Sequence, residues 1–203
     1  LEGNKGKTFD GTGFKPSFRH LRKTKEMRLG IVVNLSSPTT DYYRSVNPFQ
    51  RLRSQMKNLT VKYLNPETVK WYDFIDVDVL LFQRPNGDGM LSMIAEARKM
   101  GKKIILDHDD LLHEVNLANP ASEHFGKTKV KESVEKAFAY ADYLMVSTPF
   151  LKEFYKQFFD ESKIMVIPNA IDFRVTPFVP VGKDKLEAKL KRIIWRGSMT
   201  HIE

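Results

Sequence analysis

Residues 141–172 read ADYLMVSTPFLKEFYKQFFDESKIMVIPNAID, and this stretch decides the fold class. Its apolar run at residues 143–147 predicts a short buried strand. Thr148 is then placed to cap a helix over 149–158, because threonine is a good N-cap and proline follows it at the first helical position. A second apolar run at residues 164–167 predicts the next strand, which the following Pro-Asn closes. A strand, a helix and a strand in this order indicate a parallel β-α-β unit.

Predicted strands and helices also alternate in the preceding sequence. Short apolar strands are predicted at residues 29–34, 61–64, 78–83 and 103–106. Amphipathic helices are predicted at residues 48–57, 89–100 and 129–140, with Asn47 as the N-cap of the first. We therefore expect an α/β domain with a doubly wound, Rossmann-like parallel sheet that helices cover on both faces.

Composition shifts divide the chain into four parts. Residues 1–27 read as a basic flexible arm, and residues 28–175 as the Rossmann-like domain. Proline, glycine and a charged stretch indicate a connector at residues 176–190. The RIIW run at residues 192–195 predicts a strand that has no sheet partner in this sequence. We therefore expect residues 191–203 to be the first strand and loop of a truncated second α/β domain.

The formal net charge of +8 is concentrated in the arm. Residues 1–28 contain eight basic residues against three acidic ones, a net of +5, and the remainder of the chain has a net of only +3. We expect the arm to be a solvated tail, and peripheral contact with an anionic membrane surface stays open. A charge of +3 is too small for a domain that follows DNA, so a nucleic-acid partner is not expected.

The sequence also bears on where the protein works. No run approaches the ~20 apolar residues that a membrane-spanning helix needs. The first residues, LEGNKGKTFDGTGFKP, contain no apolar segment of the kind found in secretory signals. The sequence has no cysteine, which fits a reducing compartment. We expect a cytoplasmic protein.

A dense polar group, DHDD, follows the strand at residues 103–106. In open parallel sheets ligands bind beyond the carboxyl ends of the strands, which is where this group falls. His108, Asp109 and Asp110 could supply a general base, orient sugar hydroxyls or bind a divalent cation. The same carboxylates could instead cap a following helix, and both interpretations stay open. The spacing lacks the His-Glu-x-x-His pattern of zinc hydrolases, so we expect no metal site.

Other strand ends carry weaker candidates. Tyr42, Tyr43 and Arg44 follow the first strand and could stack on and clamp a ligand, although a partly buried aromatic pair beside a surface arginine fits equally well. Arg84, at the end of the strand at 78–83, could pair with an anion or form a surface ion pair of small consequence. The segment after the first strand, SSPTTDYYR, contains no glycine, so a dinucleotide site is not expected there.

A succession of motifs resembles one known family. The order IILDHDDLLHEV, ADYLMVSTPFLKEFY, KIMVIPNAID and RIIWRGSMTH is similar to that of GT-B glycosyltransferases of the retaining, family-four type (glycosyl transferases group 1), especially bacterial and phage-encoded members. The resemblance covers about residues 28–203 and is most specific in residues 141–172. It implies two Rossmann-like domains that face each other across a cleft, the first binding the acceptor and the second the nucleotide-sugar donor. This chain would then be the acceptor-side half, which is not expected to turn over without the missing C-terminal donor domain.

The resemblance also implies roles for the candidate residues. One of His108, Asp109 and Asp110 is expected to lie near the transferred sugar, and the resemblance leaves open which one is catalytic. The candidate acceptor contacts are Tyr42, Tyr43, Arg44, Arg84 and Asn169. The first loop of the donor-binding domain, near the donor diphosphate, is formed by Arg196, Gly197 and Ser198.

The implied reaction moves a sugar from a nucleotide sugar to a carbohydrate, a lipid-linked compound or another hydroxyl acceptor. The nucleotide sugar is a co-substrate, and no cofactor is expected. Two other functions stay open: a non-catalytic interaction or structural module that kept the fold, and a sugar-nucleotide epimerase. A pair of glutamates eight residues apart in a downstream domain would favour the transferase over the module.

Overall fold

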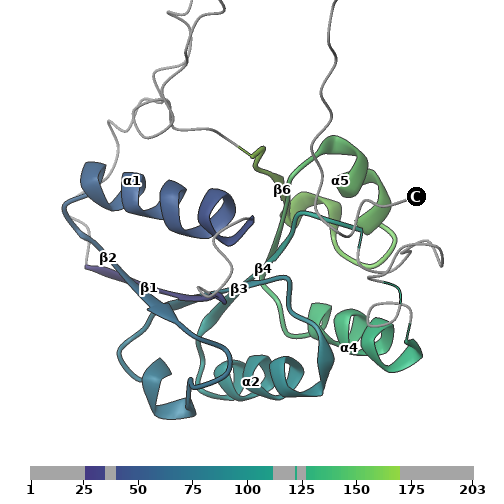
Figure 1. The fold of residues 1–203 in the computed structure, drawn as a ribbon, viewed down its shortest axis with the longest axis horizontal. Helices are drawn as coiled ribbons and strands as arrows, with labels where there is room; N and C mark the ends of the chain where they lie inside the picture. The colour runs from purple at the N-terminus through teal and green to yellow at the C-terminus, as the bar shows by residue number, and fades with distance from the viewer. Residues whose placement is uncertain (1–25, 35–39, 112–121, 123–126, 170–203) are drawn as a thin grey trace, which may run out of the picture.

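The computed structural model describes residues 26–34, 40–111, 122 and 127–169. These residues form a six-stranded parallel sheet with helices on both faces (Figure 1), which confirms the predicted doubly wound α/β class. Most of the predicted arm, the connector and the start of the second domain lie outside the described residues. No helix in the part of the chain that the structure describes is long and apolar enough to cross a membrane.

All neighbouring strands are parallel and follow the order β2-β1-β3-β4-β5-β6. The strands are β1 (Met27–Val32), β2 (Leu59–Leu64), β3 (Val79–Gln83), β4 (Lys103–His108), β5 (Tyr143–Val146) and β6 (Ile164–Val166). The chain runs outward from β1 to β2 and then, from β3 onward, in the opposite direction. The direction of winding therefore reverses between β1 and β3, and this switch point is where open α/β sheets form their ligand crevice.

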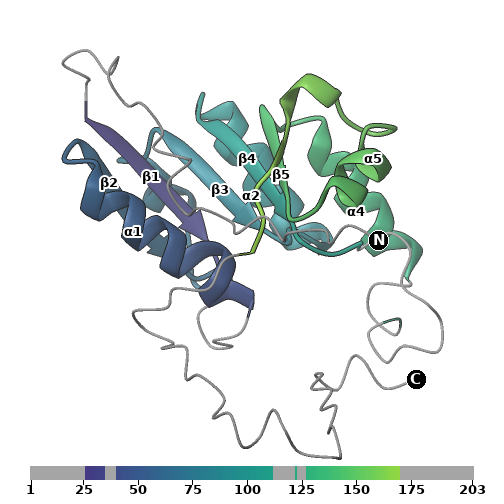
Figure 2. The same cartoon turned by 90° about the horizontal axis from the view of Figure 1, so that it is seen from above.

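The helices divide between the two faces of the sheet. They are α1 (Asn47–Gln55), α2 (Gly87–Lys99), α4 (Thr128–Phe138) and α5 (Pro149–Tyr155), with a π-helical turn η1 (Tyr42–Val46) and the 3₁₀ turns η2 (Trp71–Phe74) and η3 (Glu161–Lys163). Helix α1 lies on one face, and α2 and α4 lie on the other (Figures 1 and 2). Right-handed crossovers that run in opposite directions place their helices on opposite faces, so this division follows from the strand order.

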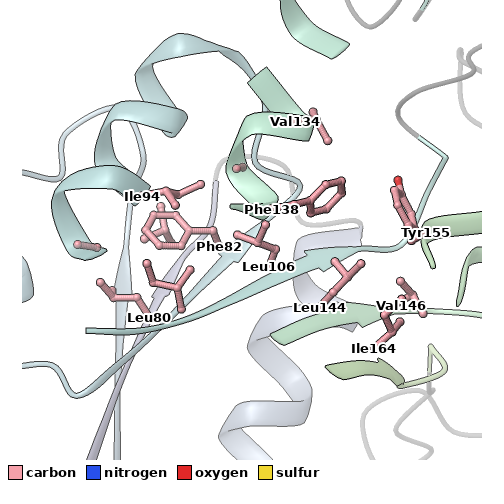
Figure 3. Close-up of a cluster of buried hydrophobic side chains, with 14 of the residues drawn as sticks. Leu80, Phe82, Ile94, Leu106, Val134, Phe138, Leu144, Val146, Tyr155 and Ile164 are labelled. Atoms are coloured by element: carbon pink, nitrogen blue, oxygen red, sulfur yellow. The ribbon is translucent and has the colours of Figure 1, made fainter. Parts of the chain in front are cut away.

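Alternating strand residues build two apolar layers. On one face Leu80 and Phe82 of β3 belong to one buried cluster with Ile94 of α2, Phe138 of α4 and Tyr155 of α5 (Figure 3). The intervening residues of the strands face the other way, against α1, and include Leu29, Ile31 and Leu81, with Phe49 and Leu52 packed on them. Because side chains alternate along each strand, the strands contribute apolar residues to both layers.

Several element boundaries differ from the predictions by one to three residues. Strand β1 begins at Met27, two residues before the predicted start, and β4 continues through His108, two residues beyond the predicted end. Asn47 is not an N-cap, because the helical path already runs through η1 and the Asn47 N–H donates to the Tyr42 carbonyl. The following Pro48 has no N–H to donate, so its position resembles a helix start even within a continuous helical path.

The β5-α5-β6 unit follows the prediction closely. The Thr148 side chain caps α5 by accepting a hydrogen bond from the Leu151 N–H, at 3.2 Å. Helix α5 ends at Tyr155, three residues earlier than predicted, and β6 spans Ile164–Val166. A turn and η3 connect the end of α5 to the start of β6.

Candidate active site at the carboxyl edge of the sheet

The polar side chains at the end of β4 point to opposite faces of the sheet. Because side chains alternate along a strand, His108 points to the opposite face from Asp107 and Asp109. His108 is 0% exposed, and its ring lies 5.7 Å from that of Phe138 and 5.3 Å from that of Tyr155, between centroids. Of the three residues predicted to lie near a transferred sugar, His108 is therefore part of the core, and the two aspartates remain at the edge.

Arg44 is buried and links separate parts of the protein. It is not at the surface, which was one of the two alternatives that the sequence left open. Its side chain is 2% exposed and forms an ion pair with Asp107, whose side chain is 1% exposed. The Nε atom donates to Asp107 Oδ2 at 3.2 Å, and Nη2 donates to Oδ1 of the same residue. The Nη1 atom donates to the Ile167 carbonyl and, at 3.3 Å, to Asn169 Oδ1. Arg44 thus joins η1 to the end of β4 and to the chain that leaves β6.

The buried pair has an electrostatic consequence. Burial raises the pKa of Asp107 to about 6, and the hydrogen bonds and charge of Arg44 oppose this rise. The Asp107 carboxylate is therefore held in its ionised form near pH 7 mainly by one arginine. Removal of that arginine would leave a charged group without compensation in the interior.

Arg84 holds the two edge aspartates. Its Nε donates to Asp109 Oδ1 at 2.5 Å, and its Nη2 donates to Asp109 Oδ2 at 2.8 Å and to Asp110 Oδ2 at 2.5 Å. Burial acts to lower the pKa of Arg84, but the hydrogen bond and charge of Asp109 outweigh it and the pKa is raised. The ion pair predicted as one alternative for Arg84 is present, and it links β3 to β4.

The backbone at Arg84 is strained. Its φ of +44° lies in the left-handed region, which costs a non-glycine residue about 1 kcal/mol or more. The Arg84 N–H donates to the Asp107 carbonyl at 2.8 Å, and Asn86 Nδ2 donates to the Arg84 carbonyl at 2.8 Å. These bonds, together with the three from the guanidinium, fix the conformation. Such strain is concentrated at functional sites.

Hydrogen bonds from neighbouring elements also hold the main chain of the two aspartates. Ser147 Oγ, just after β5, donates to the Asp109 carbonyl at 2.9 Å. The Tyr155 hydroxyl of α5 donates to the Asp110 carbonyl at 3.2 Å. The two side chains differ in access, because that of Asp109 is 4% exposed and that of Asp110 is 64% exposed. Asp110 is therefore the carboxylate that a ligand can reach.

Sequence reasoning did not single out several residues of this edge. Asp107 was counted in the DHDD group, but its pairing with Arg44 joins residues 63 positions apart. Gln83 lies beside Asp107 in the sheet register and accepts a 2.5 Å hydrogen bond from Ser45 Oγ. One feature of the sequence does point to Asp107. If the alternation of the strand at 103–106 is extended by one residue, Asp107 falls on a buried strand face, where a polar residue needs a partner.

Other predicted residues are placed as follows. Tyr42 and Tyr43 lie in η1 with their ring centroids 5.4 Å apart and nearly perpendicular planes. Asn169 lies beside Arg44, so the structure brings these two acceptor candidates together. The donor-loop residues Arg196, Gly197 and Ser198 lie outside the described residues. Within the described ranges, no group of three His, Cys, Asp or Glu side chains is arranged to hold a metal ion.

Comparison with known proteins gives no family for this chain. No family model and no curated protein matches it. One solved structure that it resembles is the crystal structure of a conserved protein from Enterococcus faecalis V583, with 12% sequence identity and a TM-score of 0.35. The match covers 70% of this chain and 91% of that chain. A likeness this low carries no argument about function.

Proposed function

We propose that this chain is the acceptor-side domain of a retaining GT-B glycosyltransferase that uses a nucleotide sugar. The observation that carries the proposal is the exposed carboxylate of Asp110 at the carboxyl edge of the sheet, where Arg84 pairs with this carboxylate and Tyr155 holds the Asp110 main-chain carbonyl. This edge lies next to the β1/β3 switch point, where α/β sheets bind ligands. The order of motifs in the sequence, which resembles that of family-four glycosyltransferases, supports the same function.

The proposed reaction breaks the bond between the sugar C1 and the diphosphate oxygen and forms a bond between C1 and an acceptor oxygen. The acceptor hydroxyl gives its proton to the departing diphosphate or to water, and the nucleoside diphosphate leaves. Asp110 is suited to accept a hydrogen bond from the acceptor hydroxyl and so to orient it toward C1. Asp109 has both carboxylate oxygens bonded to Arg84, so it positions Arg84 and, through it, Asp110.

The charges at this edge favour the acceptor side over the donor side. A leaving diphosphate needs positive charge or a helix N-terminus for stabilisation. Arg44 and Arg84 are each already paired with carboxylates. The described edge is therefore better suited to hydroxyl groups than to a diphosphate, and in this proposal the donor is held by a second domain that includes residues 196–198.

The test is a screen of the intact gene product against a panel of nucleotide sugars, read as released nucleoside diphosphate. Asp110→Asn is expected to lower release at least about tenfold, because the neutral amide oxygen of asparagine accepts a weaker hydrogen bond from the hydroxyl than a charged carboxylate does. Its melting temperature should stay near that of the unmodified protein, since the side chain is largely exposed. Asp109→Asn is a less clean variant, because it also disrupts a buried ion pair and should lower stability.

Asp76→Asn is the matched control, since Asp76 is 88% exposed and precedes β3 at the opposite edge of the sheet. It should release nucleoside diphosphate at the unmodified rate. If Asp110→Asn and Asp76→Asn lower the release of nucleoside diphosphate equally, Asp110 is not part of the site. If no nucleotide sugar is consumed at all, the transferase proposal fails and a non-catalytic module becomes the better interpretation.

A further inference from the structure

The carboxyl edge of this basic protein is acidic. Six charged side chains interact there, two of them positive and four negative: Arg44, Arg84, Asp41, Asp107, Asp109 and Asp110. With all six ionised the edge has a net charge of −2, whereas the whole chain has +8. The sign at the proposed site is thus opposite to that of the protein.

Both arginines of this described group are already paired with carboxylates. Arg44 is buried and directs its guanidinium to Asp107 and to the chain after β6. Arg84 directs its guanidinium to Asp109 and Asp110. Among the described side chains of this group, an anionic ligand would therefore meet carboxylates whose two arginines are already paired.

A buried donor lies at the same place. Gln83 is 6% exposed, and its Oε1 accepts from Ser45, the residue after Arg44. Its Nε2 has no hydrogen-bond partner within the described part of the chain. Gln83 is also paired in register with Asp107, so this amide belongs to the edge between η1, β3 and β4. A buried water molecule that bridges this nitrogen to a neutral ligand oxygen would satisfy it.

We propose that this site selects an acceptor that is uncharged or positively charged around its accepting hydroxyl and rejects one with a carboxylate or phosphate there. The inference rests on the proposed function, because it takes Asp110 as the group nearest the acceptor. Hydroxyls and ammonium groups can donate to the exposed Asp110 carboxylate. A carboxylate or phosphate cannot donate when ionised, and it is repelled by the net negative edge.

The test uses three methyl glycosides that share one ring: a neutral glucoside, its 2-amino counterpart and its uronic acid. Binding of each to the intact gene product is measured by ligand-observed NMR at low ionic strength, where exposed charges are least screened. The neutral and amino compounds should bind at least about fivefold more tightly than the uronic acid, as expected for unscreened repulsion of roughly 1 kcal/mol. Asp110→Asn should narrow this ratio, and Asp76→Asn should leave it unchanged.

The outcomes separate the two proposals. Equal or tighter binding of the uronic acid overturns the inference, and so does failure of all three compounds to bind a protein that releases nucleoside diphosphate. A preference for neutral and amino compounds that Asp110→Asn does not reduce also overturns it, because the preference would then arise elsewhere. If the preference is present but no nucleotide sugar is consumed, the charge selectivity stands and the transferase proposal fails.

Discussion

Arg44→Met should destabilise the domain strongly and in a pH-dependent way. The change removes four hydrogen bonds from a buried guanidinium and leaves Asp107, whose side chain is 1% exposed, without the cation that is hydrogen-bonded to it. Removing one partner of a buried ion pair costs about 3–5 kcal/mol. Domains have about 5–15 kcal/mol of stability in total, so the loss near pH 7 is a large share of it.

The pH dependence follows from the pKa of Asp107. Burial raises this pKa to about 6 in the folded protein, above the value of about 3.9 expected when unfolded. The folded state therefore holds the proton more tightly, and the stability from this group, present at low pH, is lost as the pH rises through 6. Without Arg44 the pKa of Asp107 rises further, so the carboxyl group takes up its proton at a higher pH in the variant than in the unmodified protein. Because one pKa unit is about 1.4 kcal/mol, the loss caused by Arg44→Met should be smaller near pH 5 by about that amount.

The assay is urea denaturation of both proteins near pH 7 and near pH 5, followed by circular dichroism. Arg98→Met is the control, because Arg98 is 46% exposed and its pair with Asp142 should contribute less than about 1 kcal/mol. The double variant Arg44→Met/Asp107→Leu should recover much of the loss, since it leaves no buried charge. A loss for Arg44→Met no larger than that of the control, or one that is equal at the two pH values, would refute this account of the pair.

Two further variants test the packing and capping that build the fold. Gly30→Ala would place a Cβ 2.8 Å from Leu80 Cδ2 in the core and should lower the free energy of unfolding in urea by about 1–3 kcal/mol. Gly89→Ala is the control and should not lower it, because no atom lies within 4 Å of the added Cβ. Equal effects of the two changes would contradict the close approach at β1. Thr148→Ala removes the cap on the Leu151 N–H and should lower the free energy of unfolding by about 1 kcal/mol, while Thr148→Ser should retain most of it.

The layered fold could be predicted because it depends on local patterns. Runs such as residues 143–147 and 164–167 are apolar because parallel strands are covered on both faces. Thr148 and Pro149 mark a helix start through contacts within one turn. The boundary at Asn47 was wrong for the same local reason, since Pro48 lacks an N–H whether it begins a helix or lies within a helical path.

The candidate site was only half predictable. The sequence by itself determined that polar residues of β4 fall at a carboxyl edge, because strand direction and connection order fix which ends meet. Only the tertiary structure decided their roles: His108 entered the core between Phe138 and Tyr155, and Asp110 stayed exposed. Arg44 is buried because its guanidinium pairs with Asp107. This aspartate lies 63 positions later in the chain and needs a partner inside the protein. Pairings of this kind depend on which faces come together in space, and no spacing along the chain records them.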